Sequence, residues 1–119
     1  MKSTVRSELG RIQVSDEAIA EMSAAAAMKV NGVAGLGTGG RLETLAQVLG
    51  VDKGGHGVGV ETVGREVSLR VNLLVDFGAD IAEVGLAVQE AVREAVETMC
   101  GLDVREVDIL VQGVRARNR

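Results

Sequence analysis

The side chains best suited to catalysis or metal binding are scarce in this sequence, which has one histidine, His56, and one cysteine, Cys100. A structural zinc site needs about four nitrogen or sulfur ligands, and no cluster of carboxylates makes up the difference. A nucleophilic cysteine needs a neighbouring base that lowers its pKa, and His56 lies far from Cys100 in the sequence. We therefore predict no metal site, an exposed loop position for His56 and a partly buried position for Cys100.

The acidic residues Glu90, Glu94 and Glu97 are spaced as the outer side of one helix. Such a set could serve in acid–base chemistry, but a charged helix side is ordinarily in contact with solvent. No other combination of nucleophile, base and orienting residue stands out in the sequence. We therefore predict a protein that is not an enzyme, with no catalytic residues, no cofactor and no small-molecule substrate.

Gly35, Gly37 and Gly40 have the G-x-G-x-x-G spacing of a dinucleotide-binding loop. That motif holds a phosphate only where a strand leads into it and a helix follows. Here a predicted helix precedes the glycines, and no acidic residue closes a β-α-β unit. We interpret the motif as part of a flexible connector.

The same glycine-rich stretch supports an alternative hypothesis, an RNA-binding module like a type I KH domain, whose G-x-x-G loop clamps a nucleic-acid backbone. The residues concerned would be Lys29, Gly37, Thr38, Gly39, Gly40 and Arg41. The net charge of −4 and the lack of tryptophan and tyrosine oppose this hypothesis, because nucleic-acid binders use a basic surface and aromatic stacking platforms. We therefore expect a protein partner rather than nucleic acid.

The composition places the chain in the cytoplasm. Its 119 residues, 46% of them apolar, suit one folded domain. A single cysteine cannot form an internal disulfide, which suits a reducing compartment. Lys2 and Arg6 are not followed by the apolar segment of a signal peptide. No run of residues approaches the ~20 apolar residues of a membrane-spanning helix.

Apolar periodicity and capping signals predict the element order β-α-(α)-β-β-α-β. The predicted elements are strand 9–14, helix 16–30, short helix 41–49, strand 58–63, strand 66–76, helix 81–99 and strand 104–114, with loops at 32–40 and 52–57. Residues 1–8 are expected to be a flexible N-terminus and 115–119 a basic, flexible tail. The sequence thus predicts one α+β domain over 9–114, with helices on one face of a small, mainly antiparallel sheet.

The predicted core joins the strand at 66–76 to the helix at 81–99. Val67, Leu69 and Val71 share one face of the strand, and residues at helical spacing form one apolar stripe on the helix. The stripe comprises Ile81, Val84, Val88, Ala91, Val92, Ala95, Val96 and Met99. Val88 and Val92 should therefore be buried against the strand.

The first helix is apolar nearly all round, which is typical of a helix covered on two sides. Its inward face is expected to carry Ile19, Met22, Ala26 and Val30. The opposite side carries Ala20, Ala24, Ala27 and Met28. Small alanine side chains allow close approach and methionine fills gaps adaptably, so we predict that these four residues form a self-association surface in a homo-oligomer.

Residues 71–114 resemble the alkaline shock protein family of Gram-positive and related bacteria, also called the envelope stress response family. The pattern is carried by Phe77-Gly78, Ile81, Val84, Gln89, Val92, Met99, Gly101, Leu102, Val104, Val107, Ile109 and Val111. The stretch from Gly10 to Leu36 fits as well, including Ile12, Val33 and Gly35. The departures are Cys100, where threonine is usual, and Phe77, where tyrosine is common.

The resemblance implies a bacterial cytoplasmic protein of envelope stress response and cell-envelope homeostasis. Members of the family are thought to act as self-associating, scaffold-like partners, and some are held peripherally at the inner face of the membrane by a separate anchor protein. No catalytic residues carry over from the family. The resemblance therefore agrees with the expectation that this chain binds proteins and catalyses nothing.

Overall fold

The computed structural model describes residues 2–37 and 57–116. In chain order, their elements are β1 (Lys2–Ser7), β2 (Gly10–Ser15), α1 (Asp16–Met28), β3 (Val33–Leu36), β4 (Val58–Val63), β5 (Glu66–Asp76), α3 (Ile81–Cys100) and β6 (Asp103–Arg115). The predicted helix at 41–49 lies outside the described residues. The other predicted helices and strands are present with small shifts at their ends.

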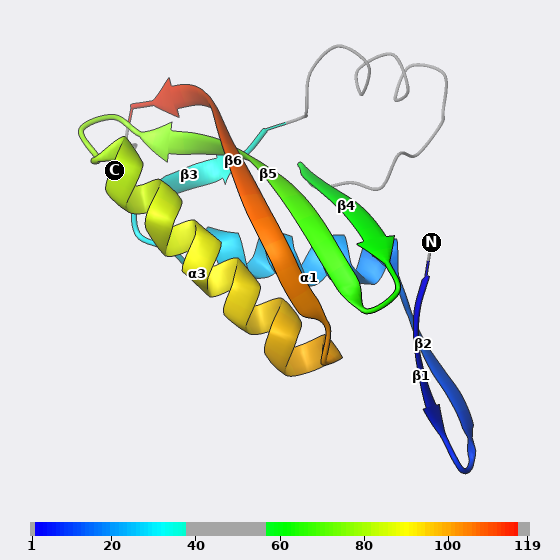
Figure 1. Cartoon of the computed structure of the whole chain (residues 1–119). Helices are drawn as coiled ribbons and strands as arrows, with labels where there is room; N and C mark the ends of the chain where they lie inside the picture. Colours follow the sequence, from blue (N-terminus) through cyan, green and yellow to red (C-terminus); the bar gives the residue numbers. More distant parts are fainter. Residues whose placement is uncertain (1, 38–56, 117–119) are drawn as a thin grey trace, which may run out of the picture.

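The strand β5 lies at the centre of the main sheet (Figure 1). The strand β4 pairs antiparallel with its first half, and β3 pairs antiparallel with its second half. The strand β6 runs parallel to β5 along nearly its whole length. A strand has only two edges for hydrogen bonding, so β3 and β4 must share one edge of β5 while β6 takes the other.

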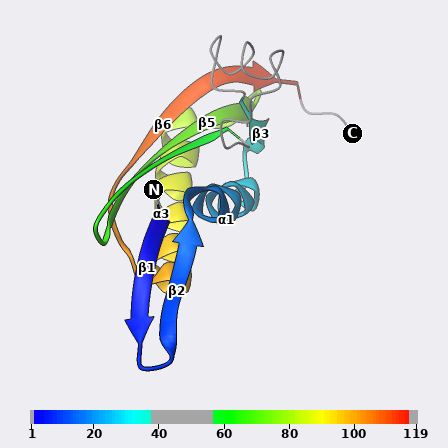
Figure 2. The same cartoon turned by 90° about the vertical axis from the view of Figure 1, so that its right-hand side faces the viewer.

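The helices α1 and α3 lie on the same side of this sheet, within its concave face (Figure 2). Their buried side chains form one hydrophobic core with those of β5. The predicted fold class, α+β with helices packed on a mainly antiparallel sheet, is confirmed. The parallel β5–β6 pair is the exception, and it exists because α3 returns the chain to the end of the sheet where β5 began.

The alternation predicted for β5 is confirmed by burial. Its core-facing side chains have relative exposures of 0–2%, and they are Val67, Leu69, Val71, Leu73 and Val75. Val88 and Val92 of α3 are fully buried, also as predicted. β-branched side chains favour strands over helices, so the valines of α3 depend on this packing to remain helical.

The buried side of α3 follows a strict four-residue spacing rather than a broad stripe. The buried residues are Val84, Val88, Val92, Val96 and Cys100. Each step of four advances about 40° beyond a full turn, so the row winds around the helix and packs as an inclined ridge. Ile81 and Met99 fall outside the row and are 48% and 69% exposed, which corrects their assignment to the core.

Local signals position both helices. The Ser15 Oγ accepts a hydrogen bond from the Ala18 amide at 3.1 Å, and Asp80 Oδ1 accepts one from the Glu83 amide at 3.1 Å. These caps satisfy backbone donors that a helix leaves unpaired in its first turn. Gly101 ends α3 with φ of 68°, a left-handed conformation that favours glycine. The helix α1 ends at Met28, two residues before its predicted end at Val30.

Two strands were not predicted. The stretch 1–8, expected to be flexible, contains β1, which pairs with β2 from Lys2↔Ser15 to Ser7↔Gly10. The stretch 32–40, expected to be a loop, contains β3. Neither has an alternating apolar pattern of useful length, and each forms because a neighbouring strand offers unpaired backbone groups.

Val92→Asp should lower the free energy of unfolding by roughly 4 kcal/mol, because it places an unpaired charge in the core. Arg93→Asp is the matched control, since the Arg93 side chain is 56% exposed and its loss should cost little. Thermal and urea melts of both variants measure the difference. Equal melting temperatures for Val92→Asp and the parent would contradict the packing of α3.

Ser23→Ala should raise stability by about 1 kcal/mol, because the Ser23 Oγ is fully buried and has no hydrogen-bond partner in the described part of the chain. Ser15→Ala is the comparison variant and should lower stability by about 1 kcal/mol, because it removes the N-cap of α1. Urea unfolding of both variants measures whether each change raises or lowers the free energy of unfolding. A loss of stability in Ser23→Ala would contradict this prediction, because it would show that the Ser23 hydroxyl makes a hydrogen bond in the folded protein.

Candidate functional site

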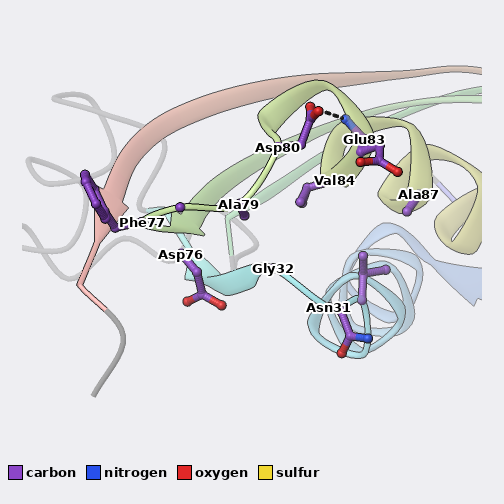
Figure 3. Close-up of a pocket in the computed structure, with 11 residues that line it drawn as sticks. Asn31, Gly32, Asp76, Phe77, Ala79, Asp80, Glu83, Val84 and Ala87 are labelled. Carbon is purple, nitrogen blue, oxygen red and sulfur yellow. Dashed lines mark hydrogen bonds between the residues drawn. The ribbon is translucent and has the colours of Figure 1, made fainter. Parts of the chain in front are cut away.

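A pocket of about 920 Å³ opens where the end of α1, the end of β5 and the start of α3 meet (Figure 3). Asp76, Asp80 and Glu83 supply its charged groups, and the lining includes no basic residue. Its lining residues are Val30, Asn31, Gly32, Asp76, Phe77, Gly78, Ala79, Asp80, Glu83, Val84 and Ala87. The Asp80 carboxylate is already engaged as the cap of α3. The pocket therefore lacks a nucleophile and would repel an anionic ligand.

One residue that lines the pocket, Gly32, has a structural role. Gly32 has φ of 98°, and its carbonyl accepts a hydrogen bond from the Asp76 amide at 2.8 Å. A Cβ at Gly32 would lie 2.6 Å from Val84 Cγ2, so glycine is needed for the chain to pass this close to the first turn of α3. Across residues 2–37 and 57–116, no three histidine, cysteine or acidic side chains are grouped to hold a metal ion.

Cys100 is buried, as predicted, and its Sγ lies 3.4 Å from Met22 Sδ. Burial raises the pKa of the Cys100 thiol, because the charged thiolate loses solvation. A raised pKa keeps the thiol protonated and poorly nucleophilic at neutral pH. The predicted loop position of His56 lies outside the described residues.

The residues of the RNA-binding hypothesis are placed only in part. Lys29 is exposed and follows α1 as its C-cap. Gly37 extends β3, with its amide donating to the Asn72 carbonyl at 2.7 Å. A Cβ at Gly37 would first meet the flexible end of the Gln112 side chain, which can move aside. Thr38, Gly39, Gly40 and Arg41 lie outside the described residues.

The predicted self-association surface on α1 is largely inside the protein. Ala20 and Ala27 are 2% and 0% exposed and belong to the hydrophobic core, while Ala24 is half-buried. Only Met28 of the four is open to solvent. The correction has a simple cause: α1 contacts α3 as well as β4, and its small side chains let those elements approach closely. The four residues therefore do not form one exposed surface.

The sequence prediction missed several exposed apolar side chains at the two ends of the molecule. The β1–β2 hairpin projects from the body, with Leu9 fully exposed at its turn and Ile12 60% exposed (Figures 1 and 2). At the other end of the molecule Phe77 is also largely exposed. Leu9 to Val14 was predicted as a strand, but nothing in residues 1–8 indicated a partner strand, so the projecting hairpin could not be foreseen.

The outer edge of β6 is a second exposed feature, of the kind that an open sheet leaves at its edge strands. Among the described strands, only β5 pairs with β6. Two side chains of α3 cover the first part of this edge: Gln89 Nε2 donates to the Val107 carbonyl at 2.9 Å, and Glu97 Oε2 accepts from the Val104 amide at 3.2 Å. The stretch 109–114 carries no charge and has no such cover in the part of the chain that the structure describes.

These observations define a small α+β protein whose described residues present strand edges and apolar side chains. Solved structures of the same architecture include two MamM CTD variants, one of them in a copper form. Each has a TM-score of 0.50 and 18% identity, over 87% of this chain and 100% of that chain. At this identity the likeness concerns the fold alone.

Sequence relatives identify the family. The alkaline shock protein 23 family, described as having a cell envelope-related function, matches residues 4–116. The chain is 32% identical to YloU of Bacillus subtilis over 99% of both chains. It is 29% identical to YqhY of the same organism, over 90% of this chain and 78% of that one. The chain belongs to the alkaline shock protein 23 family, as its sequence pattern predicted.

The Cys100 thiol should react with iodoacetamide at least about tenfold more slowly in the folded protein than in urea, because burial and the raised pKa both reduce the accessible thiolate. The alkylation rate should rise as the pH is raised beyond the usual range of a cysteine. Mass spectrometry at pH 7 to 10 measures both effects, with the urea-unfolded chain as control. A folded rate equal to the unfolded rate would contradict the burial of Cys100.

Proposed function

We propose that this protein is a non-enzymatic member of the cell-envelope stress response that acts by self-association and by scaffolding other proteins in the cytoplasm, next to the membrane. The projecting β1–β2 hairpin is the observation that carries the proposal. It places Leu9 and Ile12 in solvent, away from the core, and exposed apolar side chains of this kind favour contacts with another protein.

The chemistry of the remaining surface supports the same role. The described pocket is acidic and contains no nucleophile, and Cys100 is buried. The uncovered part of the β6 edge offers backbone groups that can pair with a strand from another chain. Recognition through backbone pairing needs few aromatic side chains, which suits a sequence whose one aromatic residue is Phe77.

Membrane proximity requires a further component. Neither helix of the described residues is long and apolar enough to cross a bilayer. Arg115, Arg117 and Arg119 add positive charge, and each basic residue near an anionic membrane contributes about 1 kcal/mol. Three such charges give only weak, salt-sensitive attraction, so stable residence at the membrane calls for a separate anchor protein.

Self-association is tested by size exclusion with light scattering at about 1 to 100 µM protein, a range that spans micromolar affinities. The mass should rise above 12.4 kDa as the concentration increases. A monomer at every concentration would contradict the proposal. So would submicromolar binding of single-stranded RNA at about 150 mM salt, where non-specific contacts are weak, because it would favour the KH-like alternative.

A further inference from the structure

The β1–β2 hairpin lacks support within its own chain. It is a two-stranded ribbon whose main contact with the body is the junction of β2 with α1. A ribbon of this kind is marginally stable alone in water and needs a third strand or a packing surface. The described residues of the same chain supply neither beyond that junction. The hairpin is therefore suited to rest on another molecule.

The uncovered part of β6 is the complementary feature. The carbonyl of Val107 and the amide of Val104, on its first part, are bonded by α3 side chains. Charged side chains, which discourage strand pairing, are also concentrated there, at Arg105, Glu106 and Asp108. From Ile109 to Val114 the edge is uncharged, and Leu110 and Val114 are about half exposed. Among the described residues, only this second part of the β6 edge is open to a new strand.

The hairpin cannot reach this edge in its own chain. It leaves the body beside the start of α1, whereas the end of β6 lies beside the start of α3, at the opposite end of the molecule (Figure 1). The Phe77 amide, which donates to the Arg115 carbonyl at 2.7 Å, fixes the end of β6 at that far position. A hairpin that pairs with this edge therefore belongs to a second molecule.

Charge favours a second copy of the same chain as that molecule. Residues 2–15 contain three basic residues and one acidic residue, a net charge of +2. The whole chain carries −4, so the remainder carries −6. The net charges of the hairpin and of the remaining chain therefore favour contact between two copies. At the edge itself, Glu106 and Asp108 precede residues 109–114 and Arg115 follows them, so Arg6 and Arg11 of the hairpin are attracted to the first end of the edge.

We propose that the β1–β2 hairpin of one copy pairs with the uncovered β6 edge, residues 109–114, of a second copy. This inference rests on the proposed self-association and names its two surfaces. Because the surfaces are different, each copy keeps a free hairpin or a free edge after pairing. Such a head-to-tail contact continues into a chain or closes into a ring, unlike a symmetric dimer contact.

Two substitutions at exposed positions test the pairing. Ile12→Glu replaces an exposed apolar side chain of the hairpin with a charged one and lowers the hairpin's net charge from +2 to +1. Leu110→Lys introduces lysine, a residue with which natural proteins block sheet edges. Each should raise the protein concentration needed for assembly at least about tenfold, as measured by light scattering. Met99→Lys is the matched control and should assemble like the parent, because Met99 is exposed but lies in neither surface.

When the two variants are mixed, one intact hairpin–edge contact should form between them. The Leu110→Lys variant keeps its hairpin and the Ile12→Glu variant keeps its edge, so their equimolar mixture should give a particle of two copies that grows no further. Thermal melts show that each variant is folded, and Ile12→Ser replaces Ile12→Glu if the latter melts early. A mixture that stays monomeric, or a single variant that assembles like the parent, would overturn this pairing.

The outcomes separate the two proposals. A parent that assembles together with variants that assemble equally well would refute the hairpin–edge contact and leave self-association standing. A parent that remains monomeric would refute both. Raising the salt concentration should weaken the parent assembly, because part of the attraction is between exposed charges, and assembly unaffected by salt would count against the charge argument.

Discussion

The packing of the α3 valine row against the inner face of β5 is the contact on which the rest of the structure depends. Five side chains of β5 and four valines of α3 have almost no solvent exposure. Burying side chains of this size contributes roughly 1.5–3 kcal/mol each, which offsets the poor helix propensity of valine. Because α3 is held there, β6 returns parallel to β5, and Gln89 and Glu97 come within reach of the β6 backbone.

The strong periodic segments were predictable from the sequence. The alternation in β5, the caps Ser15 and Gly101 and the burial of Val88 and Val92 follow from patterns that operate over a few residues. Ile81 and Met99 were misassigned because an average helical period does not reveal that a helix packs through an inclined row. That inclination is set by the neighbouring elements, which no local pattern contains.

The features on which the proposed interactions rest were the least predictable. The strand β1 has almost no apolar pattern, and it exists only because β2 pairs with it. Ala20 and Ala27 were assigned to a self-association surface because alanine suits a helix contact within one molecule as well as a contact between two molecules. Their burial depends on where α3 and β4 lie, which is long-range information. The family resemblance, carried by residues across the whole domain, predicted the family correctly but neither the hairpin nor the burial of these alanines.

The parallel pairing of β5 with β6 also has a consequence for biosynthesis. The 39 residues from 77 to 115 must be made after β5 is complete before β6 can cover it, which takes roughly 2–8 s at cellular translation rates. During that interval one edge of the most apolar strand has no partner in the nascent chain, and such edges promote misassembly. Substitutions in β5 should therefore reduce soluble yield in cells more than their effect on the purified protein suggests.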